Sequence, residues 1–81
     1  MPYFVYFLRC VDGSLYCGYT TNLKRRLKAH NKGTGSKYTR SRLPAKLVFS
    51  EKKSTLGAAL RREHALKQLS KKEKEHLISE K

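Results

Sequence analysis

Two side chains suited to anion and proton chemistry lie close together in the segment that ends at His30. Arg26 and His30 are four residues apart, so a helix places them one turn apart on one face. Leu23 and Leu27 share that side, so the face that would be buried also carries a guanidinium and an imidazole. A guanidinium binds oxyanions, and an imidazole transfers protons near neutral pH. The pattern indicates a functional face rather than an ordinary apolar one.

A carboxylate, Glu63, falls within the apolar stripe of a helix predicted to begin near residue 55. The apolar residues of that stripe are Leu56, Ala59, Leu60 and Leu66. A lone buried carboxylate is costly unless a cation, a metal or hydrogen-bond donors satisfy it. One interpretation is a metal ligand or an acid–base group at the bottom of a cleft. The other is a structural pair with Arg62, Lys67 or a residue on another element.

Two tyrosines, Tyr6 and Tyr16, lie on the arms of a predicted β-hairpin whose turn contains Asp12-Gly13. A two-residue loop pairs residue 11 with 14 and points the phenols to opposite faces. A loop of three or five residues, with residue 10 opposite 16 and residue 6 opposite 20, places both phenols on one face. Gly13 suits the left-handed position of such a turn. Tyrosines in strands are more often core than catalytic, so the length of this turn decides whether they belong to a site.

The elements that must position these groups follow from apolar periodicity and from helix caps. The predicted elements are strands over 3–11, 15–20 and 47–50, helices over 23–31, 55–69 and from 71 onward, and a short helical turn within 36–42. Thr21 or Asn22 caps the first helix, Ser54 or Thr55 begins the second, and Ser70 opens a capping box. The order ββαβαα predicts an α+β fold with a small three-stranded mixed or antiparallel sheet flanked by helices, in one domain over residues 1–81.

The charge of the chain favours a polyanionic partner. The 81 residues include 19 Lys and Arg against 6 Asp and Glu, a net charge of +13 that is spread along the chain. Such a field attracts nucleic acid and makes its binding depend on salt; a solubilising or ribosome-associated role is the alternative. We expect no membrane association, because there is neither an apolar run of spanning length nor a signal peptide. Cys10 and Cys17 are expected to be reduced packing residues of a cytoplasmic protein.

The order and spacing of several short motifs resemble the GIY-YIG nuclease superfamily, and most closely its small stand-alone UPF0213 branch. The motifs are Phe4-Val5-Tyr6, Tyr16-Cys17-Gly18, Arg26, His30, Tyr38-Thr39-Arg40, Glu63 and Leu66-Lys67-Gln68-Leu69-Ser70. The resemblance implies a metal-dependent endonuclease that hydrolyses phosphodiester bonds, in DNA rather than RNA, with one Mg²⁺ or Mn²⁺ ion. Since no separate DNA-binding domain is expected, we predict low sequence specificity, structure-directed cleavage in DNA repair or processing, or a protein partner that supplies specificity. The oligomeric state is not indicated.

The resemblance assigns roles residue by residue. Tyr16 is implicated in activating the attacking water, and Tyr6 in positioning water or phosphate. Arg26 faces the scissile phosphate, His30 assists proton transfer, and Glu63 holds the divalent metal. A phenol with a pKa of about 10 is a poor base at neutral pH, so Arg26, His30 and the metal are expected to lower the phenol pKa.

Further residues are expected to bind the nucleic acid or to keep the site open to it. They are Gly18, Lys24, Arg25, Lys37, Tyr38, Arg40, Arg42 and Lys72. The loop around Tyr38 suits phosphate contacts and base stacking, although an inward-packed Tyr38 fits equally well. The glycine of the first motif and the asparagine that follows the glutamate in nuclease members are both replaced, and Lys72 or Lys74 are alternative phosphate ligands. The rival hypothesis is a non-catalytic nucleic-acid-binding module that retains the fold.

Overall fold

A computed structural model describes residues 2–80; Met1 and Lys81, the ends of the predicted domain, lie outside the described residues. Its elements in chain order are β1 (Tyr3–Arg9), β2 (Leu15–Thr20), α1 (Leu23–Asn31), α2 (Lys37–Arg40), β3 (Lys46–Lys53), α3 (Leu56–Lys67) and α4 (Lys71–Ser79). These elements confirm the predicted α+β class, and α2 falls within the segment predicted to hold a helical turn. Asn22, Thr55 and Ser70 cap α1, α3 and α4, and Ser70 forms the predicted capping box.

The three strands form one antiparallel sheet in the order β2-β1-β3. β1 occupies the centre because its apolar run can be buried on both faces: Val5, Tyr6, Phe7 and Leu8 are at most 2% exposed. This strand ends at Arg9, two residues earlier than predicted, because the chain then enters the hairpin turn.

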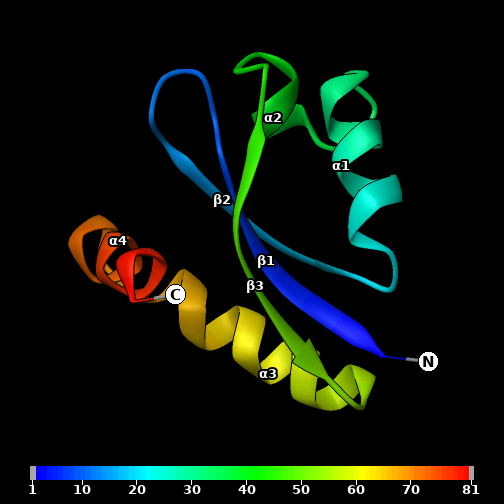
Figure 1. Cartoon of the computed structure of the whole chain (residues 1–81), viewed down its shortest axis with the longest axis vertical. Helices are drawn as coiled ribbons and strands as arrows, with labels where there is room; N and C mark the ends of the chain where they lie inside the picture. The colour runs from blue at the N-terminus through cyan, green and yellow to red at the C-terminus, as the bar shows by residue number, and fades with distance from the viewer. Residues whose placement is uncertain (1, 81) are drawn as a thin grey trace.

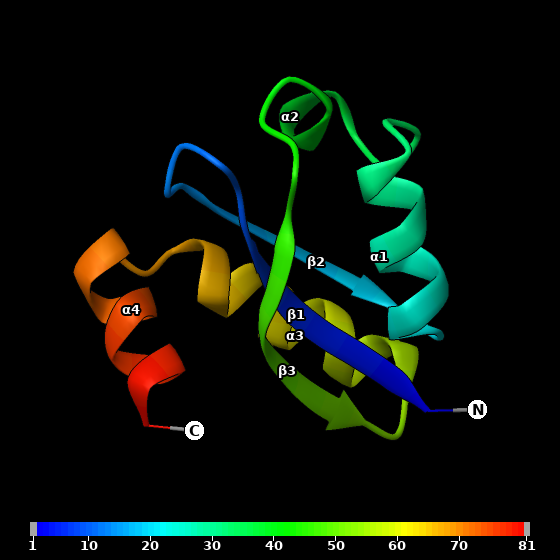
Figure 2. The same cartoon turned by 45° about the horizontal axis from the view of Figure 1, so that its top comes forward.

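Helices cover both faces of the sheet, so the alternating side chains of β1 enter two different cores. One core contains Val5, Phe7, Cys17, Phe49, Ala59 and Leu66; the other contains Tyr6, Leu8 and Ala45, with Tyr16, Leu23, Leu27 and Leu43 packed against it. Figure 1 shows α1 and α2 on one side of the sheet and α3 on the other. In Figure 2, α4 and α1 lie at opposite sides of the molecule. The sheet therefore separates the environment of Tyr6 from that of α3.

The hairpin turn has three residues, Val11 to Gly13, and this length puts both tyrosines on one face. Gly13 adopts a left-handed conformation with φ of 85°, as predicted. The strands pair Tyr6 with Gly18 and residue 8 with Tyr16, so the two phenols are diagonal neighbours. The predicted longer turn is confirmed, but the register expected for it, with residue 6 opposite 20, is wrong. A three-residue turn closed by Gly13 pairs residue 10 with Ser14 instead.

α3 packs on the sheet through a narrower face than predicted. Ala59 and Leu66 are fully buried, but Leu56 and Leu60 are 42% and 41% exposed. The predicted stripe is therefore wrong at these two positions, and the buried contact with the sheet is made by Ala59 and Leu66, which are seven residues or about two helical turns apart. Among the helices of residues 2–80, none has the length and apolar character needed to cross a membrane.

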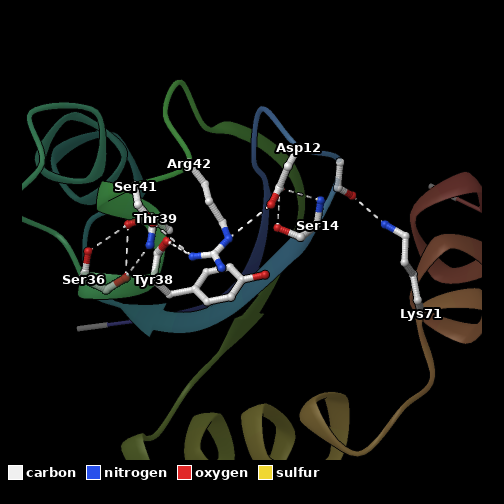
Figure 3. A network of polar contacts seen from close by, with 9 residues as sticks. Asp12, Ser14, Ser36, Tyr38, Thr39, Ser41, Arg42 and Lys71 are labelled. Carbon is white, nitrogen blue, oxygen red and sulfur yellow. Dashed lines mark hydrogen bonds and ion pairs between the residues drawn. The ribbon is translucent and has the colours of Figure 1, made fainter.

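Polar contacts attach α4 to the hairpin, in addition to the packing of Leu77 and Ile78 against the core. The guanidinium of Arg9 makes two hydrogen bonds of 2.6 Å to the carboxylate of Glu75, and this pairing lowers the pKa of Glu75 to about 2. Lys71 donates to the carbonyl of Gly13 at 2.5 Å. Figure 3 shows Lys71 reaching toward the hairpin turn. These contacts hold the start of α4 close to the end of the hairpin.

Candidate active site

Four of the five residues predicted to be catalytic lie together on the sheet face that α1 and α2 cover. The Tyr6 hydroxyl lies 3.1 Å from Nε2 of His30. The ring of Tyr16 is centred 5.1 Å from the ring of His30 and 6.4 Å from that of Tyr6. Arg26, one turn before His30 on α1, lies beside both phenols. The turn length and the helix spacing thus bring these four side chains into one cluster.

His30 is held at its other ring nitrogen by Thr39, which belongs to the Tyr38-Thr39-Arg40 motif but was assigned no role in the site. Nδ1 of His30 lies 2.8 Å from Oγ1 of Thr39, which lies 3.1 Å from Oγ of Ser36. His30 and Thr39 are both fully buried. Ser36 is the N-cap of α2 and accepts a hydrogen bond from the Thr39 amide. A serine that precedes a short helix can cap it by accepting a hydrogen bond from the residue three positions later. This capping signal points to the pair of Ser36 and Thr39.

The hydrogen-bond chain assigns the positions of the protons. Burial, and then the charge of Arg26, lower the pKa of His30 below its usual 6.5, so the imidazole is neutral at pH 7 and has one donor and one acceptor. Arg26, the other polar group beside the Tyr6 hydroxyl, only donates, so the phenol hydrogen is directed to Nε2 of His30. This arrangement assigns the ring proton to Nδ1, which then donates a hydrogen bond to Oγ1 of Thr39.

The expected lowering of the phenol pKa is wrong for Tyr6. Burial raises the pKa of Tyr6 above its usual 10.0 and outweighs the hydrogen bond from Arg26, which lowers it. His30, expected to act as a second cation, is neutral. Tyr6 is 2% exposed, whereas Tyr16 is only partly buried. Tyr6 is thus a protonated, internal phenol, and Tyr16 is the phenol of the pair that meets solvent.

Two glycines allow the cluster to pack this closely. A Cβ atom on Gly18 would lie 2.7 Å from the Tyr6 hydroxyl oxygen, and one on Gly35 would overlap the ring of His30. The Gly35 carbonyl also accepts a hydrogen bond of 3.1 Å from Nη2 of Arg26. Nε of Arg26 is buried and has no hydrogen-bond partner within residues 2–80. Gly18 was predicted to keep the strand end open, whereas Gly35 was not singled out.

Tyr38 extends the cluster toward the hairpin turn. Its ring stacks on Tyr16 with centroids 6.1 Å apart, and the guanidinium of Arg42 lies 4.0 Å from its ring centroid. Arg42 also donates to a carboxylate oxygen of Asp12 at 3.1 Å and to the Tyr38 carbonyl at 2.8 Å, as Figure 3 shows. Tyr38 is 39% exposed. This aromatic ring therefore contacts other side chains in the free protein, and its use in base stacking stays a prediction.

Glu63 lies on α3, the helix that packs on the other face of the sheet. Its carboxylate lies 3.6 Å from Nζ of Lys67, and its side chain is 17% exposed. Glu63 also acts on Cys17 of β2: burial, and then the charge of Glu63, raise the pKa of this free thiol to about 11. The structural pairing with Lys67 that the sequence had left open is therefore present. Glu63 faces the sheet near β2 and stays apart from the His30 cluster.

The remaining predicted nucleic-acid contacts lie on several surfaces. Lys24 and Arg25 line an outer pocket of about 450 Å³ on α1, together with Lys28 and Lys32. Lys37 and Arg40 are exposed on α2. Lys72 lines a pocket between α3 and α4, with Arg62, Leu69 and His76 among its neighbours. Of the two lysines considered as alternative phosphate ligands, Lys74 and not Lys72 lies in a groove beside Tyr16.

Comparisons with known proteins agree with this architecture. The family model described as the GIY-YIG catalytic domain matches residues 2–76. A UPF0213 protein of Bacillus licheniformis is 53% identical over 79 residues, which cover 98% of this chain and 81% of that protein. A UPF0213 protein of Natronomonas pharaonis is 47% identical over 78 residues, which cover 96% and 92%.

Solved structures give the same result. The solution NMR structure of a UPF0213 protein from Bacillus halodurans is 47% identical to this chain, with a TM-score of 0.65, and the match covers 100% of this chain and 86% of that one. An NMR structure of a protein from E. faecalis is 41% identical, with a TM-score of 0.64, and covers 98% and 85%. The chain therefore belongs to the GIY-YIG family, within its UPF0213 group.

Proposed function

We propose that this protein is a metal-dependent endonuclease that hydrolyses phosphodiester bonds of DNA. The observation that carries the proposal is one guanidinium, Arg26, beside a partly exposed phenol, Tyr16, and a buried phenol, Tyr6, which His30 holds in place. Phosphodiester hydrolysis requires an aligned water and a cation at the phosphoryl oxygens. Tyr16 provides a hydroxyl that can align the water, and Arg26 provides the cation. Both lie at one place.

Each residue of the cluster then has its own task. Arg26 binds the phosphoryl oxygens, and its hydrogen bond to the Gly35 carbonyl restricts the rotation of the guanidinium. Tyr16 orients the attacking water, because it is the less buried phenol. Tyr6 and His30 are almost or fully buried, so we assign them as positioning residues that hold Arg26 and Tyr16 rather than as groups that touch the substrate.

The residues present fit a metal ion only if the substrate completes its coordination. Within residues 2–80 there is no group of three or more His, Cys, Asp or Glu side chains that could hold an ion by itself. Glu63 offers one carboxylate, now paired with Lys67 at 3.6 Å. Mg²⁺ commonly binds through one or two carboxylates, waters and substrate phosphates. Glu63 would thus hold Mg²⁺ or Mn²⁺, and the ion would neutralise charge on the phosphate.

The charge distribution supports nucleic acid as the substrate. Residues 13–50 contain nine Lys or Arg and no Asp or Glu, and this segment supplies β2, α1 and α2 around the cluster. Exposed lysines contact phosphates without reading bases. We therefore propose low sequence specificity, with structure-directed cleavage in DNA repair or processing, or a protein partner that selects the site. Two free thiols are compatible with the proposed cytoplasmic location.

The decisive experiment is a cleavage panel with supercoiled plasmid, branched DNA, single-stranded DNA and RNA, in Mg²⁺ or Mn²⁺. We expect the wild type to nick DNA, and Arg26→Gln and Glu63→Ala to lose about 100-fold or more of the rate. Arg61→Gln, at an exposed position of α3, is the matched control and should cleave normally. If no substrate is cut, and Glu63→Ala and chelator leave DNA binding unchanged, the protein is instead a binding module that retains the fold.

A further inference from the structure

A groove opens at the free edge of β2, between the two layers of the molecule. It has a volume of about 270 Å³ and is lined by Leu15, Tyr16, Cys17, Tyr38, Lys67 and Lys74. We call it the β2-edge groove. β2 is an outer strand of the sheet. The groove at its edge is therefore lined by the stacked rings of Tyr16 and Tyr38 on one side of the sheet and by lysines of α3 and α4 on the other. Tyr16 belongs both to this groove and to the candidate active site.

The two lysines of the β2-edge groove differ in how far the protein neutralises their positive charge. Lys74 is only partly exposed, and no carboxylate within residues 2–80 forms an ion pair with it. Lys67 reaches Glu63 at 3.6 Å, with 52% of its own side chain exposed. Both lysines line the groove beside Cys17 of β2. Two ammonium groups that line one groove repel each other, so an anion bound between them is favourable.

We infer that the β2-edge groove binds a phosphate group of the nucleic-acid backbone, with Lys67 and Lys74 as its ligands. The inference rests on the proposed function, since it makes the groove a second phosphate position beside the one at Arg26. Tyr16 lies in both places, so a strand that enters the groove continues directly to Arg26. The acid-free segment 13–50, which contains Tyr16 and supplies α1 and α2, favours a polyanion over an isolated phosphate ion.

Protection of the edge strand explains only part of this arrangement. Charged side chains beside an outer strand deter pairing with another chain, and an exposed lysine such as Lys67 would serve this purpose. Lys74 differs, because it is partly buried in the groove wall beside aromatic rings. A lysine that only deters strand pairing is most stable when its ammonium group is fully hydrated. A lysine that binds phosphate attracts it more strongly from a partly buried position, where water weakens the attraction less.

The test is a titration of ¹⁵N-labelled protein with a short single-stranded oligonucleotide and, separately, with inorganic phosphate. We expect the oligonucleotide to shift the amide signals of residues 15–17. The Lys67→Gln/Lys74→Gln variant should reduce the salt dependence of binding, with a slope shallower by about 0.7 for each lysine. Lys74→Gln alone breaks no ion pair of the described chain and should give half of this change. A Lys52→Gln/Arg61→Gln control, which removes two exposed charges elsewhere, should keep the shifts at residues 15–17.

The outcomes of this titration distinguish the groove proposal from the endonuclease proposal. If the oligonucleotide binds at residues 15–17 through the two lysines but no DNA is cut, the groove is supported and the endonuclease proposal fails. If DNA is cut and both lysine variants keep the wild-type salt slope and KM, the groove is refuted although the activity stands. Shifts of equal size with inorganic phosphate alone would overturn the assignment to a nucleic-acid backbone.

Discussion

Replacement of Thr39 by valine tests whether the buried chain from Tyr6 through His30 is built as the structure indicates. Valine has nearly the shape of threonine, so Thr39→Val removes the hydroxyl without creating a cavity. It breaks the 2.8 Å contact with Nδ1 of His30 and the 3.1 Å contact with Ser36. Because His30 is fully buried, water cannot replace the lost partner. A buried polar group left unsatisfied costs about 1–3 kcal/mol.

For a domain of this size, each kcal/mol lowers the Tm by about 4–8 °C, so the change is measurable by calorimetry or urea unfolding. The specific readout is the tautomer of His30, from long-range ¹H–¹⁵N spectra. The wild type should carry its ring proton at Nδ1, and Thr39→Val should move population to Nε2. Thr39→Ser, which keeps the hydroxyl, should restore the wild-type tautomer. An Nε2–H tautomer in the wild type, or a Thr39→Val protein as stable as the wild type, would refute the proton assignment.

Two more predictions concern the same cluster. Gly18→Ala should destabilise the fold by about 1–3 kcal/mol through overpacking, since the new Cβ lies 2.7 Å from the Tyr6 hydroxyl oxygen; Tyr6→Phe should recover part of this loss in a double-mutant cycle measured by denaturant unfolding. The folded-state pKa of His30 is lowered from 6.5, so below pH 6.5 the unfolded chain takes up a proton that the folded chain does not. The contribution of His30 to stability is therefore complete above about pH 6.5 and decreases as the pH falls below it. His30→Gln should flatten the stability profile below about pH 6.5, and an unchanged profile there would contradict a neutral, buried imidazole.

Most of the fold was predictable because local signals and the global architecture agree. The doubly buried β1, the caps at Asn22 and Thr55 and the capping box at Ser70 each have a local physical cause, and each is present. The register of the hairpin was not predictable, since Asp12-Gly13 is compatible with turns of several lengths. One residue more or less in that turn inverts the face of every side chain on β2.

The candidate site was predictable only where its members lie on one element or on paired elements. Arg26 and His30 follow from helix spacing, and the tyrosines follow once the turn length is known. Thr39 and Gly35 were missed because their roles depend on how the loop after α1 folds back over His30. No periodicity in that polar segment reports a contact between residues nine positions apart, although Ser36 as a helix cap gives a partial signal.

The position of Glu63 across the sheet limits how the proposed reaction can be organised. A substrate phosphate held by Arg26 lies on the α1 side, whereas Glu63 lies on α3 and is paired with Lys67. Val5 to Leu8 of β1 are buried at the centre of the sheet, so we expect the two sides to meet around the edge of β2, where the groove lies. Lys67 lines that edge beside Tyr16, so a phosphate bound there would draw Lys67 away from Glu63 and free the carboxylate. Substrate binding would then prepare the metal ligand, and Mg²⁺ should bind more tightly in the presence of an uncleavable oligonucleotide than in its absence.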